Sequence, residues 1–385
     1  MKITIAPGDG IGPETMDVVL DVFRAARVPL EFEFVPMGSE LIRAGEPTGI
    51  GEEALASVER TGILLKGPML APGEDGRSAD HESVESAARR LWRAFADKRI
   101  YRILPGVRIP IGVEGIHLTM VKENPMEGYQ VAETMVSEDV ALSRRFTTRA
   151  GSRRLFRYVF EMAQRKGAKR VTCAHRADVM RLSDGLYREV FYEVASEYPE
   201  MLVDDMPVDR LARILVSAPE NLEVVSLPNM DGDLITDLAT GLVGGLDYAP
   251  VAHIGDEVSI FEPAHGALPH LAGEDRANPT ALLLAGTMML RHVGLVGHAY
   301  RIEDALGRTL EQLQNRKDLH RWISRFHTSV FRHFLLSELR NSPVPSSKPM
   351  SRNQPSNLEA VEAPADASLG GLTLPSMQSQ LDGLA

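Results

Sequence analysis

The stretch Leu227-Pro-Asn-Met-Asp-Gly-Asp-Leu-Ile-Thr-Asp-Leu238 joins the end of a predicted strand to the start of a predicted helix. If the helix begins near Asp233, then Asp233 and Asp237 lie four residues apart on one face of its first turn. Two carboxylates so arranged suit Mg²⁺ or Mn²⁺, which bind protein oxygens together with water and substrate. An ordinary acidic helix start gives the same pattern, because a helix N-terminus favours negative charge, and it is the commoner meaning of such a stretch taken alone.

Strands and helices alternate along most of the chain, which predicts an α/β fold. The first strand is expected at Lys2–Ala6, and further strands near residues 62–66, 116–121 and 170–174. An amphipathic helix is expected at residues 152–167, with Gly167 ending it, and another at about 185–196. The alternation continues to about residue 335, whereas residues 341–385 are rich in Ser, Pro, Ala and Gly and read as a disordered tail.

A glycine turn, Gly8-Asp-Gly-Ile-Gly12, follows the first strand and precedes a helix that Pro13 can begin. A turn in this position can cradle an anion with its backbone N–H groups. The glycines occupy every second position, so the turn is not the G-x-G-x-x-G fingerprint of dinucleotide-binding Rossmann folds. A tight turn between strand and helix explains it as well as a binding site does.

Composition points to a soluble enzyme of the cytoplasm. The chain has 385 residues, a net charge of −11 and 44% apolar residues, and Cys173 is its only cysteine. An acidic chain is a poor partner for nucleic acid or an acidic membrane surface. No intrachain disulfide is possible, and neither a membrane span nor a signal-peptide pattern is present, so we expect a reducing, cytoplasmic location. An anionic substrate would need a locally basic pocket.

Arginines gather between Ser83 and Arg102, at positions 89, 90, 93, 99 and 102. Such a run is usually the solvated face of a helix. The functional alternative is a clamp for a polycarboxylate, since guanidinium groups bind carboxylates with bidentate geometry. Asp209, within Pro207–Leu215, is a further candidate acid far from Asp233 in the sequence.

Several motifs together resemble the isocitrate and isopropylmalate dehydrogenases, the β-decarboxylating dehydrogenase family, and within it the NAD-dependent isocitrate dehydrogenases. The similarity covers about residues 1–310, and the order and spacing of its motifs make it specific. The motifs are Gly8–Glu14, Leu65–Pro68, Glu123-Asn124 with Tyr129, Asn229–Asp237, Gly244-Gly245, Ile254-Gly255, Phe261-Glu262, His265-Gly266, Ala272-Gly273 and Ala277–Leu284.

The resemblance implies a two-domain α/β fold that is not a Rossmann fold. The large domain would comprise residues 1–98 and 246–335, and the smaller, dimer-forming domain residues 99–245. It also implies a homodimer, although a hetero-oligomer is possible, with active sites shared so that Arg176 and Asp209 serve the neighbouring subunit.

The implied reaction is oxidation of a 2-hydroxy acid by NAD(P)⁺, followed by loss of the β-carboxylate as CO₂. Residues at family positions suggest the roles. Asp209, Asp233 and Asp237 match the ligands of Mg²⁺ or Mn²⁺, which would acidify the hydroxyl and stabilise the enolate. Tyr129 matches the tyrosine that protonates the enol. Ser83, Arg89, Arg99 and Lys122 match the positions that bind the di- or tricarboxylic acid, with Lys122 replacing an arginine.

The resemblance also implies which residues bind the cofactor. The resemblance places Glu262, His265, Gly266 and Asn278 at the nicotinamide ribose and the adenine. The next pair, His270 and Leu271, stands where NADP enzymes have Lys-Tyr and NAD enzymes have Asp-Ile. Leu271 favours NAD over NADP, and His270 is neutral.

Some residues depart from the family pattern. Arg176 in His175-Arg-Ala-Asp178 replaces the lysine held to be the general base, and arginine cannot give up its proton at useful pH. Asp178 replaces an asparagine near the nicotinamide. Glu85 replaces the asparagine that accompanies Ser83, and it would repel an anionic substrate.

Three functions therefore remain open. The first is oxidation of isocitrate to 2-oxoglutarate with NAD, as in the tricarboxylic acid cycle, with the hydroxyl proton passing to water, Asp178 or His175. The second is the same chemistry on a related acid such as an isopropylmalate-, homoisocitrate- or tartrate-like compound. The third is a catalytically altered regulatory homologue that acts on a partner subunit. Retention of the three aspartates and Tyr129 favours catalysis.

Overall fold

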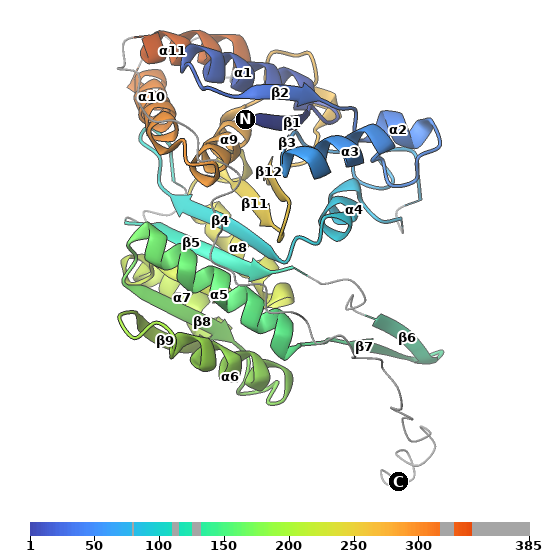
Figure 1. Ribbon diagram of the computed structural model, residues 1–385, viewed down its shortest axis with the longest axis vertical. Helices are drawn as coiled ribbons and strands as arrows, with labels where there is room; N and C mark the ends of the chain where they lie inside the picture. The colour runs from blue at the N-terminus through green and yellow to red at the C-terminus, as the bar shows by residue number, and fades with distance from the viewer. Residues whose placement is uncertain (79–80, 110–114, 125–131, 316–326, 341–385) are drawn as a thin grey trace. The chain divides into compact units, whose positions relative to one another are not determined.

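The computed structural model describes residues 1–78, 81–109, 115–124, 132–315 and 327–340. In these residues ten strands form one mixed sheet, in the order β2-β1-β3-β12-β11-β4-β5-β10-β8-β9 (Figure 1). The strands of this sheet are β1 Lys2–Ala6, β2 Glu31–Phe34, β3 Ile63–Lys66, β4 Ala96–Arg102, β5 His117–Glu123, β8 Arg170–His175, β9 Leu202–Pro207, β10 Val224–Leu227, β11 Pro250–Ile254 and β12 Ser259–Pro263. A separate antiparallel pair is formed by β6 Ala132–Ser137 and β7 Val140–Arg144. The α/β class predicted from the sequence is confirmed.

Most neighbouring strands are parallel, but the centre of the sheet is not. β11 runs antiparallel to both β12 and β4, and β4 runs antiparallel to β5. β4 therefore joins the strands from the two ends of the chain to those from its middle. The proposed division into residues 1–98 with 246–335 and residues 99–245 stays a prediction, and its first boundary falls inside β4.

Helices cover both faces of the sheet (Figure 1). On the part formed by β5, β10, β8 and β9, α5 and α6 pack on one side, and α7 and α8 on the other. α9 packs against β11, β12 and β3. The helices are α1 Gly12–Ala25, α2 Ser39–Arg43, α3 Glu52–Thr61, α4 Val84–Leu91, α5 Arg149–Lys166, α6 Ser183–Ala195, α7 Val208–Ser217, α8 Asn229–Leu242, α9 Thr280–His292, α10 Val296–Asn315 and α11 Thr328–Arg340.

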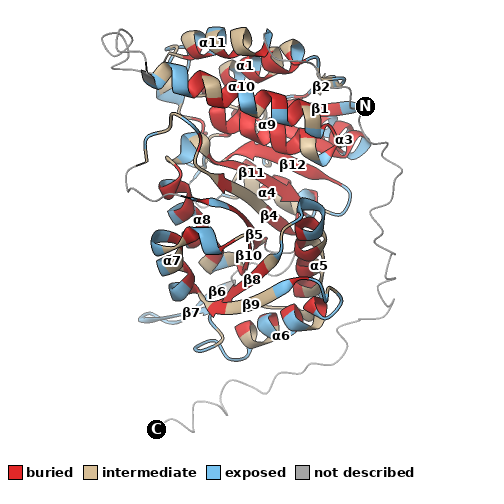
Figure 2. Ribbon diagram, turned by 90° about the vertical axis from the view of Figure 1, so that its left-hand side faces the viewer, coloured by how far each residue is buried: buried red, intermediate tan, exposed pale blue. Residues whose placement is uncertain are grey.

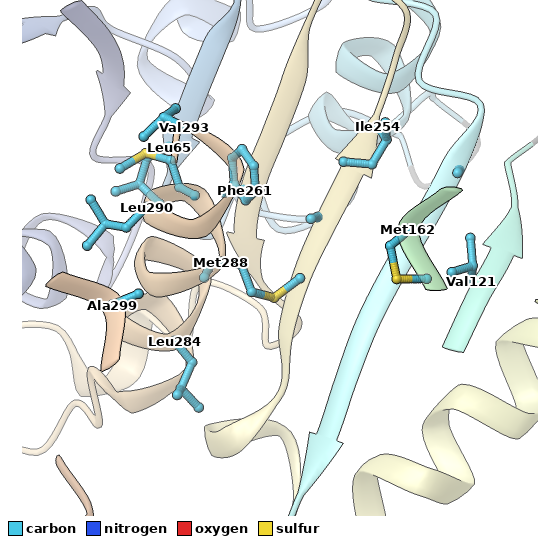
Figure 3. Packing of buried hydrophobic residues seen from close by; sticks show 14 of the residues in the cluster. Leu65, Val121, Met162, Ile254, Phe261, Leu284, Met288, Leu290, Val293 and Ala299 are labelled. Atoms are coloured by element: carbon cyan, nitrogen blue, oxygen red, sulfur yellow. The ribbon is translucent and has the colours of Figure 1, made fainter. Parts of the chain in front are cut away.

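The main hydrophobic core is continuous across β4. Figure 2 shows α9 as the most uniformly buried helix, and its residues Thr280–Leu290 are all buried. In Figure 3, Met288 of α9, Ile254 of β11 and Met162 of α5 lie along this core, which belongs to a single cluster of buried side chains. Apolar burial of this extent is the dominant stabilising contribution in a domain of this size. No helix in the described residues is both long and apolar enough to cross a membrane.

Sequence periodicity predicted the long helices well and the site helix less well. Leu155, Val159, Phe160 and Ala163 of α5 are fully buried, and Gly167 ends the helix in a left-handed conformation. By contrast, α8 begins at Asn229 directly after Pro228, and Asp231 is the acidic residue of its first turn. The prediction that α8 starts near Asp233 was wrong, because Gly232 was taken to lie before the helix.

Candidate active site

Two predicted substrate cations lie beside two predicted metal ligands. Lys122 Nζ of β5 is 2.6 Å from Asp233 Oδ1, and Arg99 Nη1 of β4 is 3.4 Å from Asp237 Oδ1. These partners are 111 and 138 residues apart in the sequence. The fold thus assembles a compact group of opposite charges from a strand pair and the helix that covers it.

Strand geometry explains why these side chains meet. Alternate residues of a strand point to opposite faces, and residues directly opposite in an antiparallel pair point to the same face. Tyr101 donates a hydrogen bond to the Thr236 carbonyl of α8 at 2.9 Å, so Arg99 and Asp97 also face α8. The register pairs Asp97 with Lys122, which places Lys122 on that face as well.

Gly232 gives Lys122 room to reach Asp233. A Cβ at Gly232 would lie 2.5 Å from Cγ of Lys122. Glycine inside a helix lowers stability by about 1 kcal/mol relative to alanine. At this position it lets the lysine stem cross the first turn of α8.

Asp97 is a member of the site that sequence reasoning missed. It is only 2% exposed and accepts hydrogen bonds from Arg99 Nε and Nη2, both at 3.2 Å. Lys122 Nζ lies 3.4 Å away. Burial alone would raise the pKa of Asp97, but the charges of Arg99, Lys122 and His253 hold that pKa well below its usual range. Asp97 therefore stays ionised and fixes the guanidinium group of Arg99 through two of its donors.

The three predicted metal ligands do not form one cluster among the described residues. Asp233 and Asp237 expose 58% and 72% of their side chains, whereas Asp209 lies exposed on α7. In the described parts of the chain, no three His, Cys, Asp or Glu side chains come together closely enough to hold a metal ion. The donor types suit Mg²⁺ or Mn²⁺, but the described residues of a single chain do not complete the set.

On the cofactor side, two of the predicted residues are buried. Glu262 of β12 forms an ion pair with Lys66 and lies 2.8 Å from His253 Nε2. Burial would raise the pKa of Glu262, but Lys66 and His253 hold it well below its usual range. His265 is also buried, and its Nε2 atom lacks a hydrogen-bond partner in the described residues. A buried ring nitrogen without a partner is costly unless a ligand satisfies it, so His265 fits a cofactor site.

The other cofactor candidates lie in the segment that follows. Gly266 and His270 are exposed and Leu271 is partly exposed. The Asn278 side chain accepts hydrogen bonds from the backbone N–H and the hydroxyl of Thr280 at 3.1 and 2.6 Å, which organises the start of α9. These residues form an accessible surface next to His265.

The glycine turn is engaged by the protein itself. Asp9 N donates to the Pro68 carbonyl and Ile11 N to the Ala267 carbonyl, both at 2.8 Å, while Gly12 N bonds back to Asp9. Gly8 and Gly10 have φ of 82° and 56°, a region that favours glycine. Since three N–H groups of the turn already bond to the protein's own carbonyls, the tight-turn explanation accounts for this segment without a bound anion.

The arginine run serves several purposes. Ser83 caps α4 by accepting a hydrogen bond from Ser86 N at 3.1 Å, and Glu85 lies in the first turn of the same helix. Arg90 pairs with Glu82 at 2.8 Å on the surface. Arg89 lies close enough to Glu262 to lower the pKa of its carboxyl. Only Arg89 and Arg99 of the run therefore remain in the neighbourhood of the site.

The family model for isocitrate/isopropylmalate dehydrogenase matches residues 2–333 of this chain. The chain belongs to that family. It is 40% identical to the NADP-specific isocitrate dehydrogenase of Thermus thermophilus over 80% of this chain, and it spans 62% of that relative. It is 38% identical to the 3-isopropylmalate dehydrogenase of Methanothermobacter thermautotrophicus, over 81% of this chain and 91% of the relative.

Solved structures agree with this assignment. A crystal structure of isocitrate dehydrogenase from Methylococcus capsulatus superposes with a TM-score of 0.77 at 32% identity, covering 88% of this chain and 99% of that one. The resemblance inferred from the sequence and the family fold are both confirmed. Members of the isocitrate/isopropylmalate dehydrogenase family catalyse the oxidative decarboxylation of hydroxy acids.

The loop after β8 holds the main departure from the family. The side chain of Arg176 is exposed, and its backbone N–H donates to Asp184 Oδ2 at 2.7 Å. His175 is buried with Nε2 2.7 Å from Asp205, while Nδ1 accepts a hydrogen bond from Ala177 N at 3.0 Å. Both ring nitrogens of His175 are hydrogen-bonded within the protein, whereas Asp178 is exposed. Of these two predicted proton acceptors, Asp178 is therefore the more accessible. Tyr129 lies outside the described residues.

A second buried polar group lies behind this loop, and sequence reasoning missed it. Arg145 bridges Asp184 at 3.0 Å and Asp231 at 3.4 Å, linking the start of α6 to the start of α8. Near it, burial raises the pKa of Glu123 to about 7, an effect that Arg145 and Arg154 oppose. The Glu-Asn motif at the end of β5 was the only sequence signal for this cluster.

Proposed function

We propose that this chain is a metal-dependent, NAD-linked dehydrogenase that oxidises a 2-hydroxy acid and releases its β-carboxylate as CO₂. Isocitrate, giving 2-oxoglutarate, is the first candidate substrate. The observation that carries the proposal is the adjacency of Arg99 and Lys122 to Asp233 and Asp237. A cationic pair next to two outward carboxylates is what a metal-chelated hydroxy acid requires.

The residues would divide the work as follows. Arg99 and Lys122 would bind substrate carboxylates, with Asp97 holding both cations in place, and Arg89 would contribute a third positive charge. A bound Mg²⁺ or Mn²⁺ would acidify the substrate hydroxyl and stabilise negative charge on its oxygen. Glu262 and His265 would hold NAD⁺, which would supply a hydride acceptor when bound. The hydroxyl proton would leave to water or Asp178, and loss of CO₂ would leave an enolate that one proton on carbon converts to the 2-oxo acid.

A second copy of the chain would complete the site. α8 exposes Leu234 (75%), Met230 (49%) and Leu238 (37%) next to Asp233 and Asp237. Contiguous exposed apolar side chains are typical of protein interfaces. A homodimer formed through this face would bring Asp209 of the second copy to the metal and Arg176 to the substrate. A hetero-oligomer with a related subunit would use the same face.

Specific observations support two further points. Leu271 does not offer the polar or cationic partner that a 2′-phosphate needs, which favours NAD over NADP. Asp97 lies beside Arg99, and Glu85 lies one turn before Arg89 in α4. These carboxylates favour the second candidate, a related 2-hydroxy acid that is less anionic than isocitrate. The net charge of −11 and the single cysteine support a cytoplasmic enzyme.

The deciding experiment is NADH formation by the purified full chain in the presence of Mn²⁺. Isocitrate, isopropylmalate, homoisocitrate, malate and tartrate would each be tested with NAD⁺ and with NADP⁺. Turnover of isocitrate with NAD⁺ would support the first candidate, and turnover of another acid alone would support the second. No turnover with any acid would overturn the proposed activity and favour the regulatory homologue.

A further inference from the structure

The face of β4 opposite the substrate cations carries a second group of basic side chains. Since residues alternate along a strand, Lys98, Ile100 and Arg102 point away from α8, on the reverse face from Asp97 and Arg99. α5 and α9 pack on this face. Lys166 of α5 donates a hydrogen bond to Thr119 of β5 at 2.8 Å, and Thr119 pairs with Ile100 of β4 in the sheet.

Two helices end next to Lys98. Arg165 and Lys166 form the last turn of α5, and Arg291 and His292 form the last turn of α9. Arg165, Lys166 and Arg291 are close enough to Lys98 for their positive charges to lower its pKa, and Lys98 and Arg165 lower the pKa of His292 in turn. Beneath them lie Met162 and Met288, one helical turn earlier on each helix and both buried (Figure 3).

Few carboxylates face this cluster. Glu303 of α10 is already shared by Arg102 at 2.9 Å and Arg291 at 2.7 Å. Glu223 lies near Lys166, but its Oε2 accepts a hydrogen bond from Lys169 N. Within the described part of the chain, Lys98 and Arg165 form neither a hydrogen bond nor an ion pair through their side chains.

The pKa values of several basic groups in this cluster are lowered, as expected where positive charges lie close together with few carboxylates to balance them. Burial, together with Lys166, Arg165 and Arg291, lowers the pKa of Lys98 to about 8. Burial, together with Lys98 and Arg165, lowers the pKa of His292 to about 4. Burial also lowers the pKa values of Lys166 and His117.

Cations at the ends of two helices have an ordinary explanation, because a helix C-terminus attracts positive charge. That explanation accounts for Arg165, Lys166 and Arg291 helix by helix. It does not account for Lys98, which comes from a strand and adds a further ammonium group where the two ends meet. Nor does the overall charge explain it, since the chain carries a net charge of −11.

We propose that Lys98, Arg165 and Lys166 form a second anion-binding site, for a small multivalent oxyanion, on the reverse face of β4 from the substrate cations. Arg165 and Lys166 are exposed and give the anion access from solvent. Lys98 provides a charge that is partly buried and unpaired. Phosphate and polycarboxylate groups share the required chemistry, several oxygens with two or three negative charges in a compact volume.

The test is calorimetric titration of the full-length protein with inorganic phosphate and, separately, with tricarballylate, at constant ionic strength. The wild type should bind at least one of them saturably. Lys98→Met should weaken binding about tenfold or more, since one desolvated charge contact is lost. Arg165→Met, at an exposed position that does not endanger folding, should weaken it severalfold. Arg157→Met on the same helix should leave it unchanged, and Arg99→Gln on the opposite face should leave phosphate binding unchanged.

The outcomes separate the alternatives. Phosphate binding that weakens in Lys98→Met would support a phosphate site, and tricarballylate binding that also weakens in Lys98→Met would support a broader oxyanion site. Absence of saturable binding to the wild type would overturn the inference. So would wild-type affinity in both Lys98→Met and Arg165→Met, or loss of binding in Arg99→Gln with retention in Lys98→Met, which would place the anion among the substrate cations.

Discussion

At the scale of single residues, the site depends on a carboxylate that the sequence did not single out. Asp97 lies in a strand among arginines and lysines, where an acidic residue usually means a solvated ion pair. Its importance comes from the register that places it opposite Lys122 and under α8. Strand pairing between segments distant in sequence is not encoded in local patterns, so Asp97 could not be identified without the fold.

Replacing Asp97 should destabilise the protein in a pH-dependent way. Asp97→Asn removes a negative charge that balances the positive charges of Arg99 and Lys122. Loss of one member of a buried charge group lowers the free energy of unfolding by about 3 kcal/mol. The pKa of Asp97 is lowered in the folded state, so its contribution is complete above the ordinary carboxyl pKa of about 4 and is lost as pH falls below it. Urea denaturation should therefore show a large difference from the wild type at pH 7 and a smaller one at pH 3.

The exposed Asp139→Asn in the turn between β6 and β7 is the matched control and should change the free energy of unfolding by less than about 0.5 kcal/mol. A difference for Asp97→Asn that stayed constant between pH 7 and pH 3 would contradict the proposed ionisation.

Glu123 should have the opposite dependence on pH. Its pKa is raised from 4.5 to about 7, so the folded state holds a proton that the unfolded state releases between these values. The free energy of unfolding consequently falls as pH rises through this window, by about 3 kcal/mol in total. Glu123→Gln cannot ionise and should lack this fall, which makes it more stable than the wild type at pH 8. Equal pH profiles for the two proteins would show that Glu123 is not held protonated.

At the scale of elements, the sequence predicted those parts whose signals are local. The buried face of α5, its glycine end and the strand β1 follow from periodicity and end signals over a few residues. The start of α8 was misplaced, because Gly232 reads as a helix breaker. Glycine is needed at this position because the side chain of Lys122 packs against the helix there. That is a tertiary contact, and no local sequence pattern contains it.

The glycine turn after β1 allows a direct test of its structural role. Gly10 has φ of 56°, and a Cβ there would lie 2.0 Å from the backbone oxygen of Ala267. Gly10→Ala should therefore reduce the free energy of unfolding by about 3 kcal/mol or more, since both strain and a backbone displacement are involved. Gly45→Ala is the matched control, because its φ is 99° but no heavy atom lies within 4 Å of the added Cβ.

The control should lose only the strain energy, about 1–2 kcal/mol. Chemical denaturation of both variants measures the difference. If Gly10→Ala were no less stable than Gly45→Ala, the close packing of the turn against Ala267 would not be a feature of the protein in solution.

At the scale of the whole molecule, the continuous sheet and core hold the candidate substrate and cofactor residues, but the three predicted metal ligands do not come together among the described residues. Asp233 and Asp237 project from α8, whereas Asp209 stays apart on α7. The family resemblance named all three aspartates. Whether a second copy of the chain supplies one of them is encoded neither in the sequence pattern nor in a single folded chain.

The role of a second copy can be tested through the exposed face of α8. Leu234 is 75% exposed next to Asp233, so Leu234→Glu places a charge in the proposed interface without disturbing the core. Sedimentation should show a dimer for the wild type and a monomer for the variant. Because Mn²⁺ stabilises only the state that binds it, the metal should raise the Tm of the wild type and not that of Leu234→Glu. Asp209→Asn should also lose this rise while remaining a dimer.

Phe34→Glu, at an exposed apolar residue of the edge strand β2, is the control and should keep both the dimer and the response to Mn²⁺. The combination of a monomeric Leu234→Glu and a dimeric Asp209→Asn, both insensitive to Mn²⁺, is expected only if the metal lies between two copies. A monomeric variant whose Tm still rises with Mn²⁺ would mean that one chain binds the metal alone, and Asp233 and Asp237 would then need a third ligand from their own chain.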